Sequence, residues 1–276
     1  MDKFPFAVRL AGFPREAAQA LETTLRAAPA HGPQYFCLSE HSLQEPDLVL
    51  AYGPDLKAMA ELSAQADVPG ELDLRPALVL GQPAAPLPYP GLPLAFDPGA
   101  FHIQLALLVA RRADALARLA GEGLPPIPER RRMPRLDFDL TDPAEYEAMR
   151  GKSRRGAVLV VDGGGRLAAQ ASQLMKPYRI TVLAASDEAS ALAAGAEAPL
   201  SVVLINTSLP GIDAYRVSAA LRAQADAQPP EVVLVVAPPF KYDGKRGRAA
   251  GVAGLLDKPV ADATLRTVLK RQMHIA

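Results

Sequence analysis

Polar residues that could do chemistry follow three apolar runs in the second half of the chain. Asp162 comes directly after Ala157–Val161, Asn206 comes after Ser201–Ile205, and Lys258 follows the short run LLD. Apolar runs without polar alternation are typical of strands that are buried on both faces of a parallel sheet. Open α/β sheets carry their sites at the carboxyl ends of the strands. We therefore expect a carboxylate, an amide and an ammonium group to meet at one edge of a sheet.

A glycine run and two basic groups are further candidates for binding an anion. Gly163-Gly164-Gly165 precedes a predicted helix and could form a backbone nest, but it lacks the Gly-Lys-Ser/Thr of a P-loop, so a loosened loop is the favoured interpretation. The four histidines are scattered, and no Ser-His-Asp, Cys-His or metal-ligand pattern appears. We therefore expect no catalytic residue, metal or cofactor. The first basic group is Arg130, Arg131, Arg132 and Arg135. The second, Lys241, Lys245, Arg246 and Arg248, is interpreted as a solvated face, with contact to an acidic patch of a partner as the alternative.

Length and composition limit the class of protein. The chain has 276 residues, enough for two domains of roughly 100–150 residues each. Its 30 basic and 30 acidic residues cancel, which gives no overall attraction to nucleic acid or anionic lipid. The single cysteine, Cys37, excludes an internal disulfide and fits a reducing cytoplasm. No signal peptide is visible, and no apolar run reaches the ~18 residues that a membrane span needs.

Strands and helices alternate in both halves of the chain, which predicts parallel sheets linked by helical crossovers. The second half, from residue 156, is regular in this respect. The first half, residues 1–121, has a long helix predicted over Gly99–Leu119 and a proline-rich stretch, Gln82–Gly91, that cannot be helical. The strands expected in the first half are Phe4–Leu10, Gln34–Leu38, Asp47–Tyr52, Arg75–Leu80 and Leu92–Phe96.

The second half resembles the receiver domains of response regulators. Three motifs carry the resemblance: VLVVD at Val158–Asp162, the strand into LPG at Leu209–Gly211, and LLDKPV at Leu255–Val260. The resemblance implies two CheY-like domains of flavodoxin type, each a five-stranded parallel sheet in the order 2-1-3-4-5. In the first half it rests on the order of elements alone, with a second helix shortened to Glu40–Pro46.

The receiver's phosphorylation chemistry does not fit this chain. Asn206 stands where the phosphoacceptor aspartate should be, Gly163 replaces one member of the acidic pair, and Ala237 replaces the switch hydroxyl, while Asp162 and Lys258 are retained. Phosphoryl transfer depends on positioning and charge, and an amide cannot form an acyl phosphate. We therefore expect a degenerate phosphoacceptor pocket in which Asp162, Asn206 and Lys258 bond to one another. In the first half Tyr52 stands at the phosphoacceptor position.

Residues 122–155 are predicted to be a linker between domains 1–121 and 156–276, with a short helix near Pro143–Met149. Its prolines favour an extended spacer. Its arginines are interpreted as a solvated cluster. As an alternative, the spacing of Arg131 and Arg135, with Arg132 between them, resembles the arginine pair that binds cyclic di-GMP in PilZ domains.

The long helix is apolar on two sides. Phe101, Leu105 and Leu108 should face the sheet, whereas Ile103, Leu107 and Ala110 lie on the opposite side. A surface helix is normally polar there. We expect these three residues to contact the second domain or, preferably, a second copy in a homodimer. The competing interpretation is that the loop Gln82–Gly91 covers them.

The function expected from the sequence is a non-enzymatic, cytoplasmic tandem pseudo-receiver of two-component signalling, which acts by protein–protein interaction. No DNA-binding segment is visible. The alternatives are a cyclic-dinucleotide sensor, or a regulator phosphorylated at a displaced acidic residue such as Asp187 or Asp213.

Overall fold

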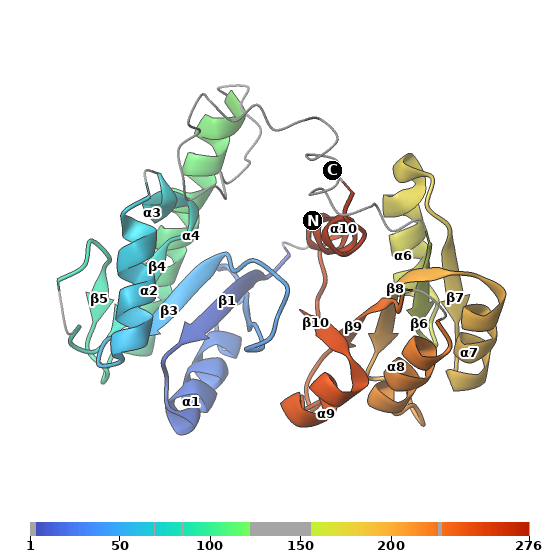
Figure 1. The fold of residues 1–276 in the computed structure, drawn as a ribbon. Helices are drawn as coiled ribbons and strands as arrows, with labels where there is room; N and C mark the ends of the chain where they lie inside the picture. The colour runs from blue at the N-terminus through green and yellow to red at the C-terminus, as the bar shows by residue number, and fades with distance from the viewer. Residues whose placement is uncertain (1–3, 69, 84–85, 122–155, 226–227, 276) are drawn as a thin grey trace, which may run out of the picture. The chain divides into compact units, whose positions relative to one another are not determined.

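The computed structural model of the chain describes residues 4–68, 70–83, 86–121, 156–225 and 228–275 (Figure 1). The chain divides into two compact units. The first is Met1–Glu40 with Glu45–Pro134, and the second is His41–Gln44 with Arg135–Ala276. The predicted linker, residues 122–155, lies outside the described residues, and so do its arginines. Within the described part of the chain, no helix is long and apolar enough to cross a membrane.

The first unit is built on a sheet of five parallel strands in the order β2-β1-β3-β4-β5. Its helices are α1 (Arg15–Arg26), α2 (Leu56–Ala66), α3 (Glu71–Leu74) and α4 (Pro98–Gly121). Its strands are β1 (Phe6–Ala11), β2 (Tyr35–Cys37), β3 (Leu48–Tyr52), β4 (Ala77–Leu80) and β5 (Gly91–Leu92).

Alternate residues of these strands face two layers of helices, because successive side chains of a strand point to opposite faces. Val8 and Leu50 belong to a core cluster with α1 and α4, and Val49 and Ala51 belong to another cluster with α2. Leu87 and Tyr89 pack against the α2 side, where the Tyr89 hydroxyl donates to the carbonyl of Leu62 at 3.4 Å. The proline-rich loop thus covers the face opposite α4.

Two expectations for the first unit are corrected. Residues 38–47 form no helix, so the shortened second helix does not exist. The fifth strand spans Gly91–Leu92 instead of Leu92–Phe96, because the chain already turns toward α4 after Leu92. The described residues of Gln82–Gly91 contain no helix, in line with their prolines.

The second unit repeats the architecture with a sheet in the order β10-β9-β8-β6-β7. Read from the other edge, this is the order 2-1-3-4-5, so the expected fold is confirmed for both units. The strands are β6 (Ala157–Val161), β7 (Val182–Ala185), β8 (Leu200–Asn206), β9 (Glu231–Val236) and β10 (Val252–Asp257). The helices are α6 (Arg166–Met175), α7 (Glu188–Glu197), α8 (Ala214–Ala223), α9 (Gly244–Ala250) and α10 (Asp262–Gln272), with the short 3-10 helix η1 (Lys176–Tyr178) after α6.

The second sheet is covered on both faces. One core cluster joins it to α6 and α10, and the other joins it to α7, α8 and α9 (Figure 1). The side chains of Val202, Val203, Leu204 and Ile205 on β8 are completely buried. This burial explains the apolar runs without alternation. Because the strands are parallel, their carboxyl ends, where the polar residues stand, lie at one edge of the sheet.

Candidate functional site

A group of four residues, called here the strand-end cluster, lies where four strands of the second unit end. Asp162 follows β6, Asn206 is the last residue of β8, Ala237 follows β9 and Lys258 follows β10. The four strands are parallel neighbours, so their carboxyl ends lie at the same edge of the sheet. The sequence placed these residues at this edge, and the structure brings three of them into contact.

A chain of hydrogen bonds runs through Asn206. Its Nδ2 donates to Oδ1 of Asp162 at 2.8 Å, and its Oδ1 accepts from Nζ of Lys258 at 2.7 Å. The same Oδ1 also accepts from the backbone N–H of Ser208 at 3.0 Å. On the far side, Oδ2 of Asp162 accepts from the backbone N–H of Leu167 at 3.3 Å, in the first turn of α6. The amide thus spans the carboxylate and the ammonium group, and both of its polar atoms are in use.

Leu209 lies close to Gly163, the residue after Asp162. A Cβ atom at position 163 would come within 2.7 Å of Cδ1 of Leu209. Such a separation forces the neighbouring side chain to move. The described residues contain no group of three or more His, Cys, Asp or Glu side chains that could hold a metal ion. A side chain larger than glycine at 163 therefore needs Leu209 to be displaced.

The displaced acidic residues cap helices. Asp187 forms a capping box with Ser190 at the start of α7, and Asp213 accepts from the backbone N–H groups of Tyr215 and Arg216 at the start of α8. The backbone and side-chain bonds from Ser190 lower the pKa of Asp187. For Asp213, burial acts to raise the pKa, but the hydrogen bond from Arg246 and those from the backbone outweigh it, so the pKa falls.

The basic group around α9 is partly engaged with its own unit. Arg246 pairs with Asp213 at 2.7 Å and lies over the Tyr215 ring at 4.5 Å from its centre. The Tyr215 hydroxyl accepts from the backbone N–H of Asp243, the N-cap of α9. These contacts tie the starts of α8 and α9 together, so Arg246 has a structural role.

At the corresponding edge of the first unit, Tyr52 ends β3, and its ring lies 5.4 Å from that of Phe13. Asp55 caps α2 by accepting from the N–H of Ala58, and its side chain fills the space beside Gly12. The residues at this edge thus serve packing and helix capping.

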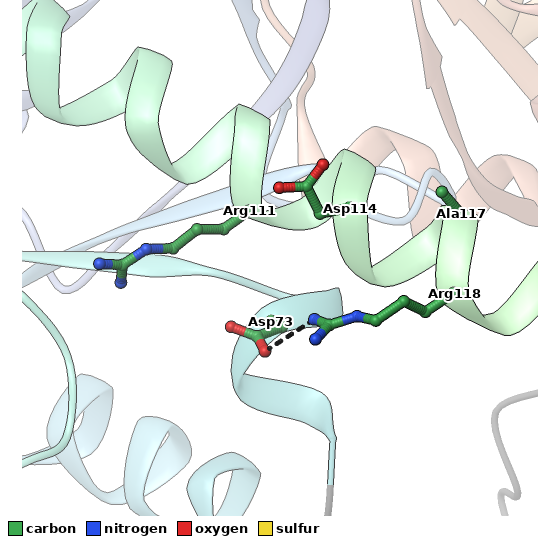
Figure 2. Close-up of a pocket in the computed structure, with 5 residues that line it drawn as sticks. All are labelled: Asp73, Arg111, Asp114, Ala117 and Arg118. Atoms are coloured by element: carbon green, nitrogen blue, oxygen red, sulfur yellow. Dashed lines mark ion pairs between the residues drawn. The ribbon is translucent and has the colours of Figure 1, made fainter.

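The first unit also has an open hollow between α3 and the C-terminal half of α4 (Figure 2). Two arginines and two aspartates line it together with an alanine, and Figure 2 shows Arg118 reaching toward Asp73, with which it pairs at 3.5 Å. The opposite charges balance within the hollow, so it offers no net attraction to an anion. The lining residues are Asp73, Arg111, Asp114, Ala117 and Arg118.

The apolar stripe of α4 is open within its own unit. Phe101, Leu105 and Leu108 are buried against the sheet as predicted. On the other side Ile103 is 62% exposed and Leu107 is 51% exposed, and Ala110 is also exposed. The interpretation that the proline-rich loop covers this stripe is wrong, because the loop packs on the opposite face of the sheet.

Comparisons with known proteins give the following. No family model matches the sequence. No curated protein is significantly similar to it either. Similar solved structures include the chemotaxis response regulator CheY4 of Vibrio cholerae, with 24% identity and a TM-score of 0.38 over 42% of this chain and 97% of that chain. The receiver domain of the sensor histidine kinase PA1611 from Pseudomonas aeruginosa has 20% identity and a TM-score of 0.37 over 43% of this chain and 97% of that chain.

A CheY-like receiver domain protein from Methanospirillum hungatei has 18% identity and a TM-score of 0.38, over 43% of this chain and 94% of that chain. The chain is thus similar to response-regulator receiver domains. The fold of each unit follows from its own strand order, without these similarities.

Proposed function

We propose that the chain is a tandem pseudo-receiver of two-component-type signalling, which takes no phosphoryl group and acts through contacts with other proteins. It is proposed to be non-enzymatic and to work in the cytoplasm, where its lone Cys37 would stay reduced.

One observation carries this proposal: the amide of Asn206, which the resemblance to receiver domains aligns with the phosphoacceptor, is bonded on both sides, to Asp162 and to Lys258. A carboxamide cannot become an acyl phosphate. Magnesium is usually held by one or two carboxylates together with phosphate, and here the single carboxylate is already bonded to the amide. The pocket is therefore held in one arrangement by its own side chains.

Intact-mass spectrometry after treatment with acetyl phosphate, and with beryllofluoride and magnesium, tests the proposal. We expect no adduct on the protein, and a stoichiometric adduct would contradict the proposal. Asn206→Asp alone should stay unlabelled, because Gly163 supplies no second carboxylate for magnesium. A variant with Asn206→Asp, Gly163→Asp and Leu209→Ala, which keeps Asp162 and Lys258, is the matched positive control.

Phosphorylation at a displaced carboxylate is a second candidate, and both candidate residues are already engaged as N-caps. Asparagine caps a helix about as well as aspartate. Asp187→Asn and Asp213→Asn therefore remove the carboxylate and keep the cap. If acetyl phosphate labels the wild type and one of these variants loses the label, the displaced-site alternative replaces the proposal.

A cyclic-dinucleotide site at Arg131, Arg132 and Arg135 remains an alternative that rests on the sequence, because these residues lie outside the described part of the chain. A thermal-shift measurement with cyclic di-GMP decides it. A shift that disappears in Arg131→Ala/Arg135→Ala would favour this alternative.

The partner is proposed to be a protein, and the stripe Ile103, Leu107 and Ala110 is the proposed contact surface. Two large apolar side chains exposed one helical turn apart support this choice. A second copy of the chain is the preferred occupant, and the second unit is the other.

A further inference from the structure

The sheet of the second unit is extended by a segment that stands far from it in the sequence. Residues His41–Gln44, called here the edge segment, belong to this unit, although Glu40 and Glu45 on either side belong to the first. Ser42 forms a parallel bridge with Leu255 of β10. The N–H of Leu255 donates to the carbonyl of His41 at 3.1 Å, and the N–H of Leu43 donates to the carbonyl of Leu255 at 2.8 Å. The edge segment therefore forms an isolated parallel bridge at the outer edge of β10, beyond the five strands of the sheet.

Gln44 continues this pairing with its side chain. Its Oε1 accepts from the backbone N–H of Asp257 at 3.2 Å, and its Nε2 donates to the carbonyl of the same residue at 3.1 Å. A carboxamide has the same donor and acceptor as a peptide group. The Gln44 side chain thus takes the place of the next backbone peptide. It is only 4% exposed, so its amide depends on these bonds.

The other side chains of the edge segment fit the surface beside β10. Leu43 packs against the core cluster of α6 and α10. The absence of a side chain at Gly254 makes room for it, since a Cβ atom there would lie 2.5 Å from Leu43. The His41 ring meets Tyr242 edge-on at 5.3 Å. The edge of β10 thus offers three features to an extended segment. These are the backbone bonds of Leu255, the space for Leu43 beside Gly254 and the partners of the buried Gln44 amide.

We propose that the outer edge of β10 is a strand-addition site, and that the edge segment of one copy of the chain can fill this site in a second copy. The identical segment makes identical contacts whether it comes from the same chain or from another, so exchange leaves every bond intact. This inference is independent of phosphorylation and of the stripe on α4.

Exchange is governed by concentration. A tethered segment faces its site at an effective concentration of about 1 mM, so segments of other copies compete only as the protein approaches that concentration. If closure within one chain is favoured roughly 10- to 100-fold, the same contact between two chains has a Kd of about 10–100 μM once the tethered competitor is removed.

In each of two variants of the whole chain, the edge segment can no longer fill the site of its own chain. The first, Leu43→Asp/Gln44→Ala, keeps a free edge but has no segment that fits it. The second, Gly254→Val, keeps the segment but blocks its own edge, because the added side chain meets Leu43. Both carry Leu107→Glu, so association through α4 is excluded. Gly254→Ala replaces the second variant if the larger substitution prevents folding.

Native mass spectrometry and sedimentation measure the outcome. Each variant alone should be monomeric, and an equimolar mixture should form a one-to-one heterodimer with a Kd in the range of about 10–100 μM. A control mixture in which the Gly254→Val chain also carries Leu43→Asp/Gln44→Ala should not associate.

Amide hydrogen exchange locates the contact. In the isotope-labelled first variant, the N–H groups of Leu255 and Asp257 should lose their bonds to the edge segment and regain protection when the second variant is added. Two folded variants that stay monomeric in the mixture up to about 0.5 mM, well above the expected Kd, would overturn the proposal. A heterodimer that leaves these two amides unprotected would overturn it as well.

Discussion

At the scale of single residues, Asn206 is the side chain that connects the strand-end cluster. It joins Asp162 to Lys258 through two hydrogen bonds. A carboxylate in its place would put two like charges side by side and leave Oδ1 of Asp162 without its present donor. With asparagine at this position, the carboxylate and the ammonium group are each bonded to the same neutral amide.

We predict that the energetic coupling between Asp162 and Lys258 passes through Asn206. Asp162→Asn keeps an oxygen that can accept from Leu167, and Lys258→Met removes the ammonium group. The double-mutant cycle of the two should give a coupling of about 0.5–1 kcal/mol in the free energy of unfolding. The same cycle in an Asn206→Ala background should give a coupling near zero. Equal couplings in both backgrounds would show that the charges interact directly.

His102 on α4 is a second residue whose chemistry follows from its surroundings. Its Nδ1 and the hydroxyl of Tyr35, whose ring is stacked on it, have no hydrogen-bond partner among the residues that the structure describes. Burial lowers the pKa of His102, and a hydrogen bond with the Thr24 backbone opposes this shift only in part. Burial also raises the pKa of Tyr35 to about 12, so both rings are neutral near pH 7.

This shift predicts a loss of stability in mild acid. The unfolded chain protonates His102 near its ordinary pKa of about 6.5, whereas the folded chain protonates it only at a lower pH. The free energy of unfolding should therefore fall as the pH drops through about 6.5 and level off below the folded pKa. Urea unfolding of the first unit at several pH values measures this slope. His102→Gln should flatten it, and an unchanged slope would assign it to other groups.

At the scale of elements, α4 is fixed to its sheet by Arg112. Its Nη1 pairs with Asp47 at 2.8 Å, and its Nε donates to the carbonyl of Leu74 in α3 at 3.0 Å. Asp47 in turn accepts from the N–H of Ala7 at 2.8 Å. Arg112 thus joins α4 to α3 and to the residue that precedes β3, and its side chain is 24% exposed.

Arg112→Met should lower the free energy of unfolding of the first unit by about 1–2 kcal/mol, because it leaves half-buried acceptors without a donor. The matched control is Arg118→Met on the same helix. Its pair with Asp73 is well exposed, and exposed pairs contribute only about 0–1 kcal/mol. Equal losses of unfolding free energy in the two variants would show that the contacts of Arg112 stabilise the unit no more than an exposed ion pair does.

The elements that the sequence predicts well are those with a local signal. The apolar run of β8 and the spacing of Phe101, Leu105 and Leu108 on α4 identify a strand and a buried helix face without any tertiary information. The pocket residues follow from strand ends in the same way. Their mutual hydrogen bonds follow from the parallel sheet, which brings those ends together.

The edge segment could not be predicted in this way. His41-Ser42-Leu43-Gln44 has neither alternation nor a run of β-branched residues, and the expectation of a shortened helix there was wrong. Its pairing with β10 joins Gln44 to Asp257, which are 213 residues apart in the sequence. Gly254 gave the only local signal, since a glycine inside a strand often marks a close approach by another part of the chain. Contacts of such long range are settled by tertiary packing.

At the scale of the whole molecule, the two units are alike in strand order and differ in how many crossovers carry helices. In the first unit the described residues between β2 and β3, and between β4 and β5, form none. The first of these connections supplies the edge segment, and the second packs Leu87 and Tyr89 against the α2 side of the sheet. Among the described residues of the first unit, no element covers Ile103 and Leu107 on the outer surface of α4.

This surface leads to a prediction about assembly. Ile103 and Leu107 lie one turn apart on α4, and their apolar side chains are 62% and 51% exposed. Removing such side chains from water typically contributes about 1–2 kcal/mol each, and a second copy presents the same pair in return. Leu107→Glu places a charge in that contact and should shift the mass measured by light scattering toward the monomer. Leu56→Glu is the matched control, because Leu56 is 72% exposed on α2, away from the stripe, and the same substitution there should change nothing. A folded Leu107→Glu variant whose mass and stability equal those of the wild type would show that the stripe is not an interface.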